Sequence, residues 1–393
     1  MTDRPADALA CHVCGAFSLH LLPGYDDRRR VTSDCRPWKS GGGLAVCRAC
    51  GAVQVPVGRV WQEEVSAIYA EYAIYTQSGG AEQLAFDPSS GQAAPRSRKL
   101  LEWAAGQGAL GPAGRLLDIG CGNGGLLRSF SALRPGWELS GTELDERNRG
   151  AVLAIPDVVG FHTGTIDELP GRFDAISMLH VLEHIPDPAR FLRSVRDRLE
   201  PGGLLLVEVP DFSQNPFELL IADHCTHFTQ DRLVALLASV GFRVHAATSA
   251  CIPKEISVLA LKDGLSPGQG TTAADALESA LAALEWLAAL VAQARELVAT
   301  RRIGIFGTAI AGSWLFGEIE EGVDFFVDED AQRIGKRYLG RPVLHPDKIP
   351  PDAQLLIPLP PAIACAIARR IQRPGIVCHL PPLRDPSKRI REM

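Results

Sequence analysis

The chain has 393 residues, which is more than one hydrophobic core usually supports, so we expect two or three domains. Its composition, with 46% hydrophobic and 22% charged residues, is that of a globular protein. The net charge of −6 and the pI near 6.0 argue against a nucleic-acid partner, because affinity for the phosphate backbone depends on clustered Lys and Arg. The longest apolar stretch, residues 280–298, carries three charged side chains, and no charged-then-apolar leader opens the chain. We therefore expect a cytoplasmic protein with no membrane segment, and the sequence leaves its oligomeric state open.

Two cysteine pairs, each with two residues between the cysteines, stand near the start of the chain: Cys11 and Cys14, then Cys47 and Cys50. A reducing compartment disfavours disulfides among the ten cysteines, so the paired spacing favours a metal. Four thiolates complete the tetrahedral shell of a structural zinc ion and leave no open position. A redox dithiol is the alternative. We assign residues 1–80 to a small zinc-binding lobe, in which the metal compensates for a small core.

A glycine-rich loop lies in residues 114–127, GRLLDIGCGNGGLL, after an apolar strand that we expect to end at Asp118. Gly120, Gly122 and Gly124 let the backbone turn closely under a ligand before a helix begins. The loop alone is also compatible with dinucleotide and phosphate binding. A second strand ends at Glu143, 23 residues after Gly120, where a carboxylate can accept both hydroxyl groups of a ribose.

Two further strands follow in residues 173–211. FDAISMLHVLEHIPDPARFLRSV predicts a buried strand, a loop and a helix from Pro188, and PGGLLLVEVPD predicts the next strand. With the glycine loop, these segments resemble the class I S-adenosylmethionine-dependent methyltransferases over residues 100–262. The resemblance implies an α/β fold with a Rossmann-like sheet, which we place at residues 81–265.

The same resemblance implies a site for S-adenosylmethionine. Asp118, Gly120 and Gly122 would line the methionine end, Glu143 the ribose, and the segment around Thr165 and Ile166 the adenine. The full set of expected cofactor residues is Asp118, Gly120, Cys121, Gly122, Glu143, Leu144, Thr165, Ile166, Leu179 and His180.

The last third of the chain predicts a second, smaller α/β domain. Residues 266–300 read as a linker and a spacer helix without chemistry, the helix running from about residue 273 to 300. Residues 301–393 then show a strand, a turn at Gly307, a helix and a strand ending at Asp328. A dehydrogenase would rest on Gly307 and Asp328 alone, and the turn lacks a G-x-G-x-x-G pattern, so we favour a degenerate or substrate-binding role.

This order of zinc lobe, core and Rossmann-like C-terminal domain resembles the sugar C-methyltransferases of antibiotic pathways, which act on nucleotide-linked keto-deoxysugars. The segments IYAEYAIYTQSGG, ADHCTHFTQDRL and FFVDEDAQRIGKRYLGRPVLHPDKIP are similar to patterns of that family. Carbon methylation beside a ketone needs a base and donors for the developing oxyanion. The predicted catalytic residues are His224 as the base, His184 as the second candidate, Asp223 as an orienting group, and Tyr72 or Tyr75 to steady the enolate or the cofactor carboxylate.

The sequence is compatible with three functions. The first is C-methylation of a nucleotide-linked sugar or a similar small intermediate. The second is O- or N-methylation of another small-molecule natural-product intermediate, which needs less base strength. The third is a non-catalytic binding protein on the same fold, since fold does not fix function.

Overall fold

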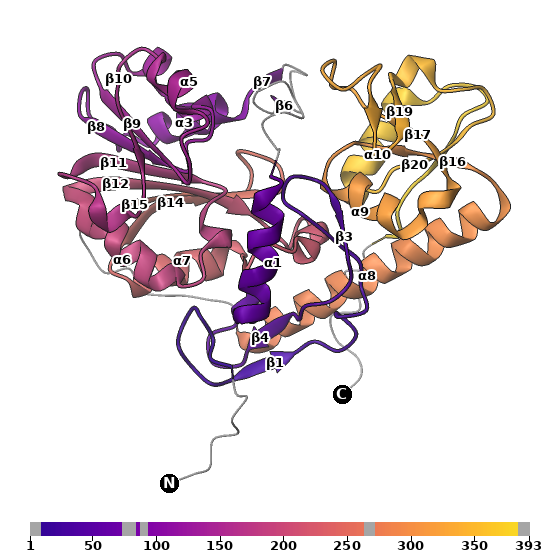
Figure 1. The fold of residues 1–393 in the computed structure, drawn as a ribbon, viewed down its shortest axis with the longest axis horizontal. Coiled ribbons are helices and arrows are strands. Elements are labelled where there is room, and N and C mark those ends of the chain that lie inside the picture. The colour runs from indigo at the N-terminus through magenta and orange to yellow at the C-terminus, as the bar shows by residue number, and fades with distance from the viewer. Residues whose placement is uncertain (1–8, 73–83, 87–92, 263–271, 384–393) are drawn as a thin grey trace, which may run out of the picture.

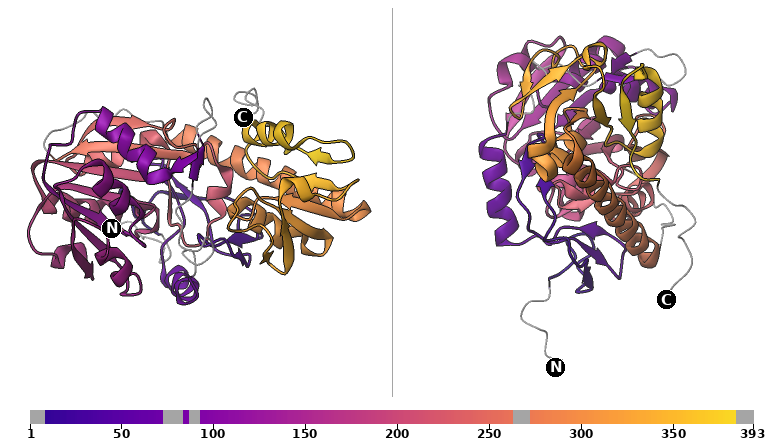
Figure 2. Two further views of the ribbon diagram at one scale, coloured as in Figure 1. Left: turned by 90° about the horizontal axis from the view of Figure 1, so that it is seen from above. Right: turned by 90° about the vertical axis from the view of Figure 1, so that its right-hand side faces the viewer.

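The computed structural model describes residues 9–72, 84–86, 93–262 and 272–383, which form three lobes (Figure 1). The core and the C-terminal domain lie at the two ends of the long axis, as the view from above in Figure 2 shows, and the N-terminal lobe lies between them. Tyr75, a predicted site residue, lies outside the described residues.

The core is built on a seven-stranded sheet with the order β10-β9-β8-β11-β12-β15-β14, and the predicted α/β class is confirmed. Strands β8 to β12 and β14 run parallel, whereas β15 is antiparallel to β12 and β14. The strands are β8 (Arg115–Ile119), β9 (Glu138–Glu143), β10 (Val158–Thr163), β11 (Phe173–Leu179), β12 (Leu199–Pro210), β14 (Arg243–Thr248) and β15 (Glu255–Leu261).

Helices cover both faces of this sheet, because alternate strand residues point to opposite sides. Leu117 and Ile176 pack in the core under α6 and α7, while Leu116 and Ala175 pack under α3 and α4. The helix α6 begins where the sequence predicts, with the Asp187 side chain accepting from the Arg190 amide at 3.0 Å. The helical segments are α3 (Arg96–Gly106), α4 (Gly125–Leu133), α5 (Arg149–Leu153), η1 (Ile166–Glu168), η2 (Leu182–His184), α6 (Pro188–Arg198), η3 (Pro216–Leu220) and α7 (Gln230–Ser239).

The N-terminal lobe shares a strand with the core. Its four-stranded antiparallel sheet has the order β1-β4-β5-β13, and β13 comes from the core segment just after His224. The domain boundary predicted at residue 80 does not account for this shared strand, because β13 lies beyond that boundary in the sequence. The lobe contains β1 (Leu19–Leu21), β2 (Arg30–Val31), β3 (Pro37–Trp38), β4 (Ala45–Cys47), β5 (Val53–Gln54) and α1 (Arg59–Ala70), with β13 (Thr226–His227) from the core; the hairpin of β6 (Leu84–Phe86) and β7 (Ala93–Pro95) precedes the core sheet.

The C-terminal domain has a six-stranded sheet with the order β18-β19-β17-β16-β20-β21. It is reached through α8 (Ala273–Thr300), the long helix that the sequence predicts, which starts at a capping box between Thr272 and Asp275. Its elements are β16 (Ile303–Phe306), α9 (Ile310–Ile319), η4 (Glu320–Gly322), β17 (Val323–Val327), β18 (Arg337–Tyr338), β19 (Arg341–Leu344), η5 (Pro346–Lys348), β20 (Gln354–Leu356), α10 (Pro361–Ile371) and β21 (Val377–His379).

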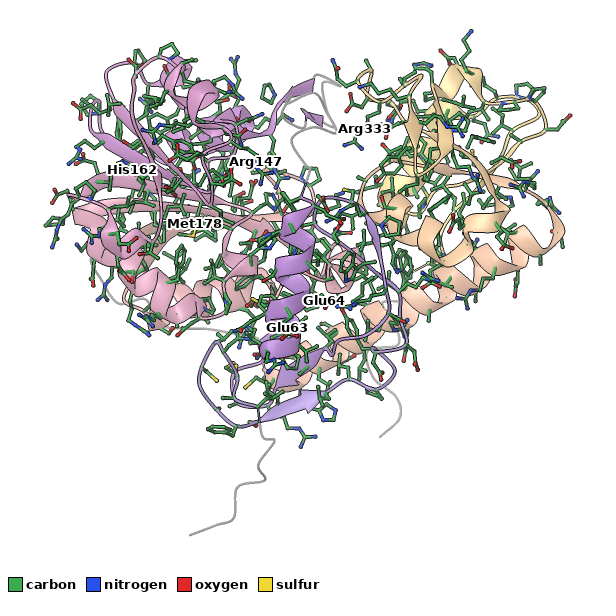
Figure 3. The ribbon with its side chains drawn as sticks, viewed as in Figure 1. Glu63, Glu64, Arg147, His162, Met178 and Arg333 are labelled. Atoms are coloured by element: carbon green, nitrogen blue, oxygen red, sulfur yellow. The ribbon has the colours of Figure 1, made fainter. Side chains whose placement is uncertain are left out.

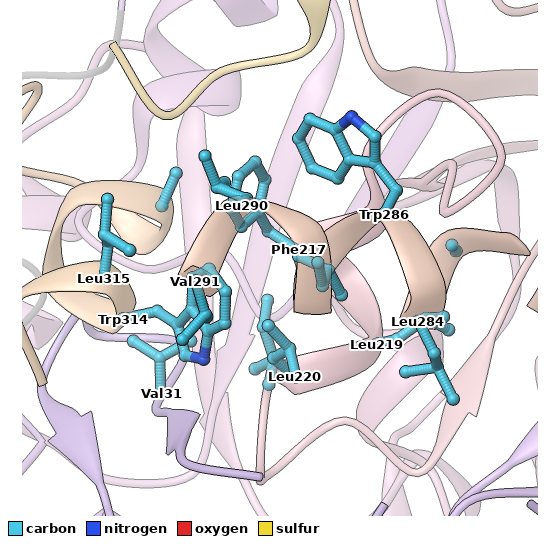
Figure 4. Packing of buried hydrophobic residues seen from close by; sticks show 14 of the residues in the cluster. Val31, Phe217, Leu219, Leu220, Leu284, Trp286, Leu290, Val291, Trp314 and Leu315 are labelled. Carbon is cyan, nitrogen blue, oxygen red and sulfur yellow. The ribbon is translucent and has the colours of Figure 1, made fainter. Parts of the chain in front are cut away.

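The three lobes meet in one apolar junction (Figure 4). Phe217 of η3 lies between two tryptophans, with ring centroids 5.5 Å from Trp286 of α8 and 5.6 Å from Trp314 of α9. Leu290 of α8 and Val31 of the N-terminal lobe are buried in the same cluster. The spacer helix therefore joins the lobes by burial of apolar surface. Among the described helices, α8 included, none is long and apolar enough to cross a membrane.

We expect Leu290→Ala to lower the free energy of unfolding by about 2–5 kcal/mol, because truncating a fully buried Leu leaves a cavity. Leu281→Ala on the same helix is the matched control, since Leu281 is 37% exposed. Its cost should stay below about 1 kcal/mol. Urea unfolding followed by tryptophan fluorescence measures both. Equal losses would contradict the role of the junction.

Candidate functional site

The predicted cofactor residues gather at the carboxyl edge of the parallel strands. Asp118 is buried at the end of β8, where its Oδ1 accepts from the Ser177 hydroxyl of β11 at 2.8 Å. Gly120 has a φ of 67°, and a Cβ there would lie 2.6 Å from the Val181 side chain. Only glycine fits this turn without displacing the loop after β11. At Gly120 the loop therefore presents backbone atoms, and no side chain, at the carboxyl edge of the sheet.

Glu143 at the end of β9 closes the other side of the loop. Its Oε1 accepts from the Gly122 amide at 2.6 Å, and its Oε2 accepts from the Leu144 amide at 3.0 Å. Leu144 itself is 82% exposed, so an apolar surface lies beside the carboxylate. A carboxylate next to an exposed apolar surface suits a nucleoside, whose ribose is polar and whose base is flat and apolar on its faces.

The remaining predicted cofactor residues lie on the neighbouring segments. Thr165 and Ile166 start η1, where Thr165 forms a capping box with Glu168. Cys121 is buried, which raises the pKa of its thiol. Leu179 ends β11, and His180 follows it with a left-handed φ of 54°. The structure thus brings these residues to the ends of adjacent strands, while their contacts with a cofactor stay predictions.

A histidine cluster lies beside this edge. His184 of η2 and His224 face each other with ring centroids 4.4 Å apart and planes at 84°. One nitrogen of each ring and one carboxylate oxygen of Glu183 lie within 4.8 Å of one another. The two predicted histidines, 40 residues apart in sequence, are therefore brought into one site.

The two histidines differ in their surroundings. The Nδ1 atom of His184 lies 3.0 Å from the Asp223 carbonyl and 3.0 Å from the Tyr69 hydroxyl. Because a carbonyl only accepts, the proton sits on Nδ1 and Nε2 keeps its electron pair. Burial and the neighbouring His224 lower the pKa of His184. Burial alone would also lower the pKa of His224, but the adjacent Glu218 carboxylate raises it to about 9.

The other predicted catalytic residues have different positions. Asp223 is buried, and its two oxygens accept from the Ser33 amide at 2.9 Å and the Ser33 hydroxyl at 2.5 Å. The Tyr72 hydroxyl lies 3.3 Å from the Ser33 hydroxyl, to which it can donate because the Ser33 proton goes to Asp223. Tyr72 therefore reaches the cluster through Ser33, and its ring packs 5.5 Å from that of Tyr69.

Sequence reasoning missed several buried charged groups at this site. Arg96 forms ion pairs with Glu208 at 2.7 Å and Glu255 at 3.2 Å, and it contacts His180. Glu183 is fully buried and bonds His180 Nδ1 at 3.2 Å, so this network reaches the histidine cluster. Tyr69 could have been found from its place one helical turn before Tyr72.

The four predicted zinc cysteines form a second cluster. Their sulfurs lie within 4.8 Å of one another, with 3.7 Å between Cys11 and Cys50 and 3.7 Å between Cys14 and Cys47. Zinc–sulfur bonds of ~2.3 Å in a tetrahedron set sulfur–sulfur distances of ~3.8 Å, so the donor set fits zinc. All ten cysteines lie in the described residues, and none of them forms a disulfide.

The C-terminal domain faces the core across the N-terminal lobe. Gly307 follows β16 with a φ of 91°, and the Thr308 amide and hydroxyl donate to Asp328 at 3.0 and 2.5 Å. Figure 3 places Arg147 of the core and Arg333 of the C-terminal domain on the sides that these lobes turn toward each other. The Tyr338 hydroxyl donates to the Cys35 carbonyl at 2.7 Å and ties this domain to the N-terminal lobe.

The core is similar to known methyltransferases. Residues 91–247 match the family model of a methyltransferase domain. The ubiquinone biosynthesis O-methyltransferase of Marinobacter nauticus is 36% identical over 122 residues, which are 28% of this chain and 48% of that protein. The enzyme of the same name from Bordetella bronchiseptica is 29% identical over 165 residues, which are 39% of this chain and 62% of that protein.

A solved structure is also similar. The 1,6-didemethyltoxoflavin-N1-methyltransferase of Burkholderia thailandensis, with 1,6-didemethyltoxoflavin and S-adenosylhomocysteine bound, is 19% identical with a TM-score of 0.38, over 54% of this chain and 96% of that one. The chain spans about half the length of the first curated relatives it matches. The matched residues include strands β8 to β12 and most of β14 of the seven-stranded sheet, so the core of this chain is similar to a methyltransferase domain.

Proposed function

We propose that this protein transfers the methyl group of S-adenosylmethionine to a carbon beside a ketone, in a nucleotide-linked keto-deoxysugar or a similar small intermediate. The observation that carries the proposal is the pair of facing histidines with opposite pKa shifts beside the carboxyl edge of the methyltransferase sheet. Ligands of open α/β sheets bind at that edge. A cytoplasmic location remains a prediction from the sequence.

The chain's own groups would hold the cofactor as follows. Glu143 would accept from the ribose, exposed Leu144 would contact the adenine, and the loop at Gly120 and Gly122 would pass under the methionine end. When bound, the cofactor supplies the methyl group as a sulfonium electrophile. Removal of the proton beside the ketone makes the acceptor carbon a nucleophile, and a neutral imidazole with a free Nε2 suits that step.

The acceptor would lie between the core and the two flanking lobes. Residues 33–35 of the N-terminal lobe contact Asp223 on one side, through Ser33, and Tyr338 of the C-terminal domain on the other, through Cys35. Both flanking lobes are therefore connected, through residues 33–35, to Asp223, which precedes His224 in sequence. A nucleotide-linked acceptor is large enough to use both surfaces, which supports this substrate class.

A second candidate is O-methylation, because the curated relatives are named O-methyltransferases. Oxygen and carbon acceptors differ in what is lost: a hydroxyl proton exchanges with water, whereas a carbon-bound hydrogen stays until the enzyme removes it. The deuterium content of the product therefore distinguishes the two candidate reactions.

The acceptor test uses nucleotide-linked keto-deoxysugars deuterated beside the ketone, with a panel of phenols in parallel. We expect a product heavier by one methyl group that has lost deuterium from the methylated carbon. His184→Ala and His224→Ala should each lower turnover about 100-fold or more, the scale of a lost acid–base group, with cofactor binding nearly intact. His245→Ala on the exposed face of β14 is the control. A methyl ether formed from a phenol, with no methylated sugar product, would instead establish O-methylation.

For the cofactor, Glu143→Ala should weaken binding of S-adenosylmethionine, measured by calorimetry, by roughly 10-fold to 100-fold. Charge-assisted hydrogen bonds to a ribose contribute about 1.5–3 kcal/mol each. Glu138→Ala, at the exposed start of the same strand, is the matched control and should bind as the parent does. Unchanged binding in Glu143→Ala would show that the ribose lies elsewhere.

We also propose that Cys11, Cys14, Cys47 and Cys50 hold one structural zinc ion, because their sulfur separations fit the tetrahedron. Metal analysis of protein purified without a metal-affinity tag should find one zinc per chain. Cys47→Ser should lose it and unfold at lower temperature, whereas Cys365→Ser in the C-terminal domain should keep it. A Cys47→Ser protein with full zinc content would exclude this site.

A further inference from the structure

We propose that Glu218 is a positioning residue that keeps His224 as an imidazolium, so that His224 donates a hydrogen bond to the acceptor's oxygen while His184 acts as the base. This inference rests on the proposed function and assigns a different step to each histidine. It gives a role to a residue that the sequence did not single out, and it moves the base from His224 to His184.

The first support is the contact itself. Glu218 is 2% exposed and His224 is 4% exposed, and Nδ1 of His224 contacts Oε1 of Glu218. The Nδ1 atom of His227 lies 3.8 Å from the same Oε1 atom of Glu218. A carboxylate removed from water needs a charged or strongly donating partner, and an imidazolium is the partner present. The proton on Nδ1 is therefore fixed, and Nε2–H becomes the donor left for a ligand.

The second support is the balance of charge around each ring. The carboxylates of Glu218, Glu183 and Asp223 all raise the pKa of His224, against burial, which lowers it. The pKa of His184 is lowered first by burial and then by the charge on His224, against the carboxylates of Asp223 and Glu183. The facing groups on the other elements, Tyr69 of α1 and His227 of β13, bring no positive charge that would displace the proton of His224. One proton thus settles on His224 and leaves His184 neutral.

The third support is that Asp223, next to His224 in sequence, cannot take the place of Glu218. Both of its carboxylate oxygens accept from Ser33 of the N-terminal lobe. Glu218 is held instead by its neighbours in η3, since Phe217 and Leu219 are buried in the junction of the three lobes. The carboxylate is therefore set in position before any acceptor binds.

The step balances as follows. Nε2 of His184 takes the proton from the carbon beside the ketone, and the two C–H electrons form the enolate. The negative charge on the enolate oxygen is met by the Nε2–H of His224. The carbon then bonds the methyl group as the sulfonium–methyl bond breaks, which leaves S-adenosylhomocysteine, and His184 later releases its proton to water. No oxidant or reductant is needed.

The test is a pH titration of the full-length protein labelled with ¹⁵N in histidine, followed by NMR without acceptor. His224→Gln assigns the signal. We expect wild-type His224 to stay doubly protonated at pH 7.5 and to lose its proton near pH 9. In Glu218→Gln the proton should be lost below pH 7, and Glu218→Asp should restore part of the shift. Glu278→Gln, on the exposed face of α8, is the matched control.

Turnover is measured on the same variants. Glu218→Gln should lower kcat about 10-fold to 100-fold, with cofactor binding unchanged, and Glu218→Asp should recover part of the loss. A neutral His224 at pH 7 in the wild type would overturn the inference. This measurement does not depend on whether any variant folds. A charged His224 with parental kcat in Glu218→Gln would overturn it as well. Absence of turnover on every acceptor would count against the proposed function, whereas the titration alone still decides the charge of His224.

Discussion

The apolar junction around Phe217 is the constraint on which the arrangement of the site depends. It gathers η3 of the core, α8, α9 and the N-terminal lobe into one buried cluster. Two of its aromatic side chains also bond across lobes: Trp314 Nε1 donates to the Arg29 carbonyl at 2.9 Å, and the Tyr25 hydroxyl donates to the Leu219 carbonyl at 2.6 Å. A buried donor without a partner costs free energy, so these bonds fix the relative position of the lobes as well as their contact.

The position of the histidine cluster depends on this junction, because η3 carries residues that contact each of them. Phe217 and Leu219 face the apolar cluster, while Glu218 between them faces His224. The cysteine cluster connects to the same histidine by a second route. Cys47 ends β4, β4 pairs with β5, and β5 pairs with β13, which begins two residues after His224. The N-terminal lobe is therefore part of the support of the site, and a zinc ion there would stabilise the strand that leads to His224.

The sequence predicted those features that local chemistry determines. The glycine turn, Glu143 at the end of β9, the long helix α8 and the cysteine spacing each depend on residues close together in the chain. Pairing β13 with β5 joins residues more than 170 positions apart, and no local pattern predicts it. Glu218 and the network of Arg96 with Glu208 and Glu255 were missed for the same reason, because a charged residue in an apolar segment shows its partner only in the folded chain.

The central claim is that His184 and His224 lie at the carboxyl edge of the sheet, on the side from which an acceptor approaches the methyl group of the bound cofactor. A crystal structure of the protein with S-adenosylhomocysteine tests this claim most directly. The account predicts the ribose on Glu143, the sulfur beside the loop of Gly120 and Gly122, and the rings of His184 and His224 on the side from which an acceptor would approach the sulfur. A sulfur that faces away from both rings, or that packed core residues separate from them, would contradict it.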